Sequence, residues 1–399
     1  MSARVDMQEK KYLGYNHTIY ACYIGYIVQA IVNNFIPLLF LTFQGVFDIS
    51  LDKITYLITV NFGIQLLVDL ASAKFVDKIG YRSAALIAHI MAAAGLMGLG
   101  FFPYIFPSAY VGILVSVCFY AVGGGLLEVI VSPIVEACPT DKKDAAMSLL
   151  HSFYCWGQVG VVLLSTLFFT LAGIKYWRIL ACIWALVPFF NIFYFLKVPV
   201  NVLVEEGESM KIGELIKSRL FWLFFAMMVC SGAAELAMSQ WASAFAESAL
   251  GISKTMGDLA GPCLFAVFMG SARAFYGKNS EKVSLQQFMK LSCILCIISY
   301  LLAAFSGSPV LALAGCALCG LSVGIMWPGT FSFAAKSMKT GGTAMFAFLA
   351  LAGDIGCAGG PTLVGIISEA FGENLQKGLI FAAIFPIVLL LCCLRINRA

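Results

Sequence analysis

Apolar stretches separated by short polar turns recur along the whole chain. Each is about 20 residues or longer, the length that a helix needs to cross a hydrocarbon core of about 30 Å. The turns between them are rich in charged residues, glycine and proline. The pattern predicts twelve membrane-spanning helices, approximately at 14–43, 52–72, 83–102, 109–133, 145–172, 177–198, 219–247, 255–272, 286–305, 309–333, 343–370 and 378–395.

Composition agrees with a polytopic membrane protein. Of the 399 residues, 61% are hydrophobic and 12% are charged, about half the charge of a soluble domain. The net charge of +4 comes from basic residues in short loops, which excludes a nucleic-acid-binding surface. The 14 cysteines are spread through the spans, where a thiol behaves as a small apolar side chain. No metal and no cofactor is therefore expected.

The basic residues also predict the orientation. Cytoplasmic loops of membrane proteins carry an excess of Lys and Arg. Placing both termini in the cytoplasm leaves outside only five of the 25 basic residues, namely Lys53, Lys175, Arg178, Lys254 and Lys377. We therefore expect a multi-pass protein of the plasma (inner) membrane with both termini cytoplasmic, and a monomer.

The two halves of the sequence repeat each other. GGGLLEVIVSP before the predicted 4–5 turn matches CGLSVGIMWPG before the 10–11 turn, and SAKFVDKIG after span 2 matches SARAFYGKN after span 8. A polar linker separates two bundles of six spans, which gives residues 1–198, 199–218 and 219–399 as the three parts. Repeats of this kind build one large class of transporters, with the substrate between the halves.

One acidic residue marks the first half of the repeat. Glu128 lies in the apolar run GGGLLEVIVSP, which we expect to end as a helix at Ser132–Pro133. An ionisable side chain is costly to keep inside a membrane, so it indicates a functional site.

The turn between spans 2 and 3 reads AKFVDKIGYRS. It resembles the G-x-L-a-D-r-x-G-r-r signature of the major facilitator superfamily, with Ala for the first Gly and Phe for the Leu. Together with the twelve spans and the repeat, this implies the major facilitator fold, an all-α integral membrane protein of two pseudo-symmetric six-helix bundles. The matching residues, expected to act in gating, are Asp77, Lys78, Gly80 and Arg82.

A narrower resemblance is to the fucose permease branch of that superfamily. GLLEVIVSP keeps the glutamate and proline of the branch's G-x-L-E-x-x-x-N-P pattern, span 1 carries its paired asparagines as Asn33 and Asn34, and MWPGTFS is similar to its span 10 run. The branch uses the span 4 glutamate and a span 1 aspartate for sugar binding and proton coupling. This chain keeps the glutamate as Glu128 but has Pro37 in place of the aspartate.

Polar residues at helical spacing complete the candidate site. Tyr26, Gln29 and Asn33 share one face of span 1, and His151, Tyr154 and Gln158 share one face of span 5. Amide and phenol groups both donate and accept hydrogen bonds, as a polyhydroxylated solute requires. The alternative is that they bond to neighbouring helices, and for His151 we favour helix packing over proton carriage.

The second half contributes acids and aromatic residues. Glu235 lies on a polar stripe of span 7, followed by Gln240 and Trp241, and Asp354 lies among the glycines of span 11. We place Arg273 at the end of span 8, so that no basic residue neutralises the acids in the middle of the membrane. The acids must then be protonated, bind a cation or meet a cationic substrate.

These observations predict a secondary active transporter for a small polar solute, a sugar or related metabolite, coupled to protons or sodium. The alternatives are an efflux antiporter for organic cations or drugs, and a non-transporting membrane sensor. An enzyme is not expected, because there is no P-loop or H-E-x-x-H motif. We expect substrate contacts from Tyr26, Gln29, Asn33, Asn34, Glu128, Tyr154, Gln158, Glu235, Gln240, Trp241 and Trp327, ion coupling by Glu128, Glu235 and Asp354, and gating by Asp69, Asp77, Lys78, Gly80, Arg82 and Arg273.

Overall fold

A computed structural model describes residues 13–139, 143–201, 212–279, 282–338 and 341–396. These residues form helices joined by short turns, and none of them lies in a strand. Twelve helices or helix groups are long and apolar enough to cross a membrane, and each overlaps one predicted span. The predicted all-α membrane fold is confirmed.

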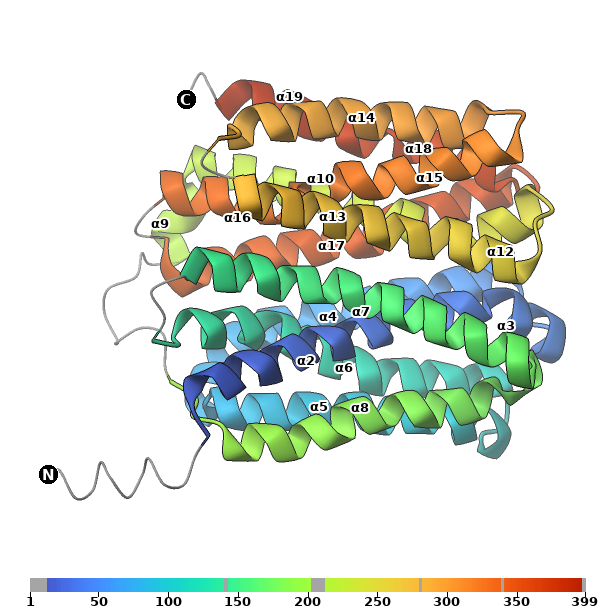
Figure 1. The fold of residues 1–399 in the computed structure, drawn as a ribbon, viewed down its shortest axis with the longest axis horizontal. Helices are drawn as coiled ribbons and strands as arrows, with labels where there is room; N and C mark the ends of the chain where they lie inside the picture. Colours follow the sequence, from blue (N-terminus) through green and yellow to red (C-terminus); the bar gives the residue numbers. More distant parts are fainter. Residues whose placement is uncertain (1–12, 140–142, 202–211, 280–281, 339–340, 397–399) are drawn as a thin grey trace, which may run out of the picture.

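The first half of the chain packs as one group of helices, in the lower part of Figure 1. Its elements are α2 (Tyr15–Asn34), a 3-10 turn (Ile36–Leu39), α3 (Phe40–Phe47), α4 (Leu51–Ile79), α5 (Tyr81–Ile105), α6 (Ala109–Glu136), α7 (Lys143–Ala172), a 3-10 turn (Ile174–Tyr176) and α8 (Trp177–Lys197).

The second half forms the upper group in Figure 1. Its elements are α9 (Ile212–Lys217), α10 (Arg219–Ser239), α11 (Ala242–Ala244), a π-helix (Phe245–Ala249), α12 (Lys254–Asp258), a π-helix (Leu259–Cys263), α13 (Leu264–Asn279), α14 (Leu285–Phe305), α15 (Pro309–Val323), α16 (Met326–Ser337), α17 (Gly342–Ala370), α18 (Leu375–Ala382) and α19 (Ile384–Arg395). We call the side where α2 begins and α19 ends, on the left of the view, the terminal side; the other is the far side.

The predicted helix end at Ser132–Pro133 is wrong. α6 continues through Pro133 to Glu136, because neighbouring helices in a membrane bundle can compensate for the backbone bond that proline removes. Spans 1, 7 and 10 are interrupted near their middles, at Phe35, Gln240–Trp241 and Gly324–Ile325. Such interruptions free backbone carbonyl groups inside the bundle.

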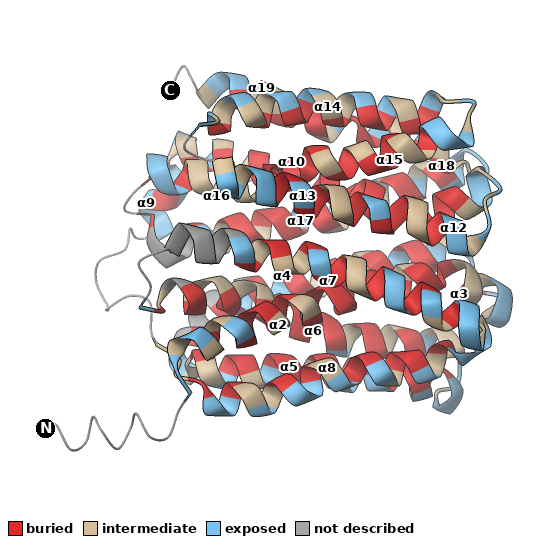
Figure 2. Cartoon of the chain, in the orientation of Figure 1, coloured by how far each residue is buried: buried red, intermediate tan, exposed pale blue. Residues whose placement is uncertain are grey.

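The inner faces of the helices are buried, and the outer faces carry the exposed positions (Figure 2). Glycine lets some helices approach very closely. A Cβ atom on Gly356 of α17 would overlap the carbonyl oxygen of Val229 on α10, whereas a Cβ atom on Gly359 of the same helix would meet nothing within 4 Å. Close backbone contact through small residues is a common way to pack membrane helices.

We expect Gly356→Ala to destabilise the protein, by about 1–3 kcal/mol, because the added methyl group forces α10 and α17 apart. Thermal unfolding in detergent measures the effect as a lower Tm. Gly359→Ala is the matched control, and it should leave Tm unchanged or slightly higher, since it adds a helix-favouring residue in open space. Equal Tm values for the two variants would contradict this account of the packing.

Candidate functional site

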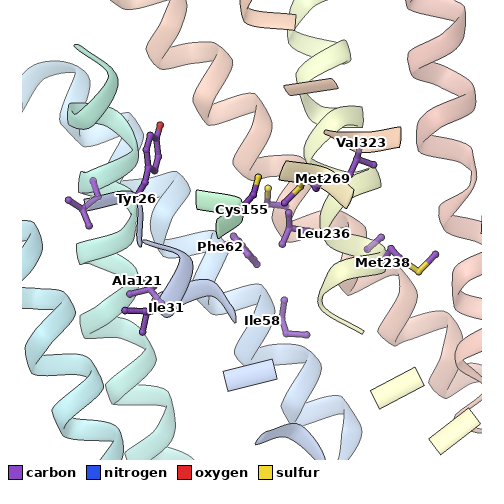
Figure 3. Packing of buried hydrophobic residues seen from close by; sticks show 14 of the residues in the cluster. Tyr26, Ile31, Ile58, Phe62, Ala121, Cys155, Leu236, Met238, Met269 and Val323 are labelled. Atoms are coloured by element: carbon purple, nitrogen blue, oxygen red, sulfur yellow. The ribbon is translucent and has the colours of Figure 1, made fainter. Parts of the chain in front are cut away.

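A cavity lies between the two halves of the molecule, with a volume of about 60 Å³. One water molecule needs about 10–15 Å³ of such space, so the cavity has room for only a few water molecules in this conformation. Eight residues predicted for substrate contact or ion coupling line it: Tyr26, Gln29, Asn33, Glu128, Tyr154, Glu235, Trp327 and Asp354. Arg273, predicted to act in gating, lines it too, and so do Phe62, His151, Leu236 and Cys357. Figure 3 shows Tyr26, Phe62 and Leu236 among the surrounding buried side chains.

Glu128 is positioned by span 1. Gln29 Nε2 on α2 donates a hydrogen bond of 2.6 Å to Glu128 Oε2 on α6. One turn further along the two helices, the hydroxyl groups of Tyr26 and Ser132 are bonded at 3.1 Å. Glu128 therefore has a neutral amide as its partner, and the Oε1 atom of Gln29 is buried without a hydrogen-bond donor.

Arg273 corrects the expected charge balance of the site. Its side chain is 6% exposed, and Nη2 lies 3.3 Å from Oε2 of Glu235. The prediction that no basic residue reaches the middle of the membrane is therefore wrong. The cause is the length of α13, which extends to Asn279 and leaves Arg273 about 9 Å from the helix end at 1.5 Å per residue.

Backbone oxygens hold the rest of the Arg273 guanidinium. Nε donates to the Gly324 carbonyl at 2.9 Å, and Nη1 donates to the His151 carbonyl on α7 at 3.1 Å. The first acceptor lies at the break between α15 and α16. Gly324 has no room for a side chain, since a Cβ atom there would lie 2.8 Å from Ala272. The ion pair thus joins three spans of the second half to the first half.

Asn33 and its neighbours form bonds between helices. Asn61 and Gln65 of α4 both donate to Asn33 Oδ1, at 3.2 and 3.0 Å, and Gln240 donates to the Asn33 carbonyl at 3.0 Å. Asn34 donates to Tyr154 at 3.4 Å. For Asn33 and Asn34 the structure supports helix association, with Asn33 also at the cavity wall.

Four predicted substrate residues lie outside the cavity: Asn34, described above, and Gln158, Gln240 and Trp241. Gln158 donates to Ser239 at 3.2 Å, Gln240 is buried against Asn33, and Trp241 donates to the Pro361 carbonyl at 2.9 Å. Each of these bonds joins different spans. A substrate role for these residues in this conformation is therefore not supported by their placement.

The predicted gating residues are dispersed. Arg82 donates to the carbonyl groups of Phe195 and Val198 at the end of α8, at 2.7 and 2.8 Å, and Lys78 is exposed. Gly80 has a φ of 80° at the junction of α4 and α5, a conformation that favours glycine. The side chain of Asp77 lies outside the described residues. Asp69 is buried on α4, facing α17.

The far side of the cavity is closed by contacts that sequence reasoning missed. Lys254 donates to the Leu38 carbonyl at 2.7 Å and pairs with Asp258 at 3.3 Å. Thr166 of α7 donates to Asp258 at 3.5 Å, and Ser243 also donates to it. The i,i+4 spacing of Lys254 and Asp258 was the available signal, but it does not reveal the partners in the first half.

Within the described part of the chain, no group of three or more His, Cys, Asp or Glu residues is arranged to hold a metal ion. Of the cavity acids, Glu128 accepts a hydrogen bond from an amide and Glu235 pairs with a guanidinium group, so these two offer hydrogen bonding and charge.

Comparison with known proteins places the chain in a family. The family model described as Major Facilitator Superfamily matches residues 22–361. No curated protein sequence matches the chain. Two solved structures of FucP are similar in fold. One is the E. coli fucose:proton symporter, with a TM-score of 0.70 and 16% identity, covering 94% of this chain and 97% of that chain. The other is FucP in the outward conformation, with a TM-score of 0.69, the same identity and the same coverage of both chains.

A third similar structure is that of a bacterial homologue of the human lysosomal transporter Spinster, inward-facing and occupied. It has a TM-score of 0.74 and 14% identity, covering 96% of this chain and 97% of that one. At these identities the likeness shows the fold alone.

We expect Arg273→Met to destabilise the protein by about 3–5 kcal/mol, because it leaves Glu235 buried without its cation. The double variant Arg273→Met, Glu235→Gln should recover part of this loss, since it removes the unpaired charge. Thermal unfolding in detergent tests both. A double variant no more stable than the single one would show that the two side chains are not energetically coupled.

Proposed function

This chain belongs to the major facilitator superfamily, and on that basis we propose that it is a secondary active transporter for a small polar solute, coupled to protons or sodium. The solute class is a sugar or a related hydrophilic metabolite, and the site of binding is the cavity between the halves. The protein would work in a plasma membrane with both termini in the cytoplasm.

The observation that carries the proposal is the mixture of groups at one cavity. Amide, phenol, carboxyl and guanidinium groups from both halves converge there, beside the indole of Trp327. A solute with several hydroxyl groups can donate to the carboxyl groups and accept from the amide and guanidinium groups. The fold likeness to a fucose:proton symporter agrees with this solute class.

Coupling is assigned to Glu128. Glu235 has Arg273 as its counter-ion, whereas the hydrogen-bond partner of Glu128 is the neutral Gln29. A carboxylate without a counter-ion in a low-dielectric site takes up a proton or binds a cation. Because α2 and α6 both line the cavity, a change of charge at Glu128 changes the electrostatic potential where the solute binds.

A cationic solute is the second candidate, and the balance of charge favours it. The cavity wall carries the acids Glu128, Glu235 and Asp354 but one guanidinium, that of Arg273. An organic cation could therefore take the place of the coupling ion, as in an efflux antiporter.

Alternating access requires that the closed far side opens. We expect Lys254→Met to loosen it, because the variant removes the bond from Lys254 to the Leu38 carbonyl. Such a charge-assisted bond contributes about 1.5 kcal/mol, or about a tenfold change in opening. Hydrogen exchange of α3 and α12 should speed up accordingly. Lys175→Met, which alters an exposed far-side lysine, is the control and should have no effect there.

The proposed function is tested in two steps. First, sugars, amino acids, nucleosides and organic cations are screened for stabilisation of the detergent-purified protein, at several pH values and with or without sodium. A sugar among the stabilising solutes supports the leading proposal, and stabilisation by organic cations alone supports the second candidate.

Next, the stabilising solute is used in proteoliposomes. We expect Glu128→Gln to exchange solute between equal pools but to lose accumulation driven by a pH or sodium gradient. Glu369→Gln, at an exposed carboxyl group, should behave as the unaltered protein. Gradient-driven accumulation by the Glu128→Gln variant would overturn the coupling role of Glu128.

A further inference from the structure

Two acids face each other across the contact between the halves. α4 of the first half and α17 of the second run antiparallel and pack along much of their length. Toward the far side, the hydroxyl groups of Thr59 and Thr362 are bonded at 2.6 Å. In the same register, toward the terminal side, the carboxyl groups of Asp69 and Asp354 face each other.

This pair is buried at the wall of the cavity, and the described protein offers it too few donors. Both side chains are in residues that are 1% exposed. Both oxygens of Asp69 and Oδ2 of Asp354 are buried without a hydrogen-bond partner. Two carboxylates cannot donate to each other, so a bond between them requires a proton on one of them. Without that proton, two negative charges would repel each other strongly in a low-dielectric interior.

Among the described side chains, none supplies a counter-ion in place of the proton. The titratable groups that face the pair are Glu128 on α6 and Cys357 on α17. Glu235 on α10 lies further away and is paired with Arg273. The other helices against α4 and α17, which are α5, α16 and α18, contribute no charged group to the pair in the described part of the chain.

We propose that Asp69 and Asp354 form a proton-binding site that joins the two halves, separate from the coupling role assigned to Glu128. With one shared proton, the carboxyl groups hold α4 and α17 together at the terminal side of the cavity. When that proton passes to water entering the cavity, both groups are carboxylates and repel each other. The halves then separate there. The role of this site in transport rests on the proposed function, whereas the binding of the proton does not.

The bound proton is detectable without any solute. Infrared difference spectra are recorded between low and high pH on the purified full chain carrying Glu128→Gln, so that Glu128 contributes no band. They should show the loss of a protonated carboxyl C=O band equivalent to one group. Asp354→Asn should abolish that band, because the amide donates to Asp69 without a titrating proton, and Asp69→Asn should do the same. In the same Glu128→Gln background, Thr59→Val should retain it. Thr59→Val is the matched control, since it removes a bond from the same helix contact but no titratable group.

Hydrogen exchange supplies a second readout. Relative to the Asp354→Asn variant at each pH, the unaltered protein should show several-fold faster exchange in residues 66–76 of α4 at high pH and equal exchange at low pH. Thermal unfolding shows whether each variant is folded. If the Asp354→Asn variant is not folded, the Asp69→Asn variant is compared with the unaltered protein in its place.

The proposal is overturned if the carboxyl band persists in both asparagine variants, or if Thr59→Val abolishes it as they do. Exchange that is equal at high pH in the unaltered protein and the Asp354→Asn variant would overturn the link between the proton and the contact of the halves. These measurements need no solute. A negative result in these measurements therefore does not bear on the transport proposal. Likewise, the absence of solute flux in proteoliposomes would not bear on the proposed proton-binding site.

Discussion

The ion pair between Glu235 and Arg273 is the contact on which the charged cavity depends. A carboxylate in a membrane interior needs a partner, and this partner comes from another span and is held by backbone carbonyl groups at Gly324 and His151. The Gly324 carbonyl is reachable because α15 ends at Val323 and because glycine follows it. A helix break and a glycine thus help to place one positive charge in a cavity lined by three acids.

The sequence predicted the fold well, because the length of an apolar run is set by the thickness of the bilayer. It also predicted that Glu128, Glu235 and Asp354 converge on one cavity, since the repeat places their spans at the interface of the halves. Arg273 was misplaced because the depth of a side chain depends on how far its helix continues. Span 8 continues through Phe275 and Tyr276 as part of α13, beyond the strongly apolar run.

Polar residues within spans were the harder problem. Asn33, Gln158 and Trp241 have the same polar groups whether they face a solute or another helix, and the periodicity of one helix does not say what lies opposite. The structure shows that Gln158 and Trp241 bond to Ser239 and to the Pro361 carbonyl. Only the partner helix distinguishes a binding residue from a packing residue.

Partners also separate the acids by role. Glu235 has a cation, Glu128 has a neutral amide, and Asp354 has a second carboxyl group. A paired carboxylate gains nothing from a proton while its cation stays, so Glu235 is suited to holding the helices in place. A carboxyl group beside an amide can exchange a proton without losing its hydrogen bond, which suits Glu128 to contact a solute. A carboxyl pair that shares a proton loses its bond when the proton leaves, which suits Asp69 and Asp354 to the proposed coupling of protonation to movement of the halves. The three acids lie near one another, yet their different partners make them respond differently to the same change in protonation.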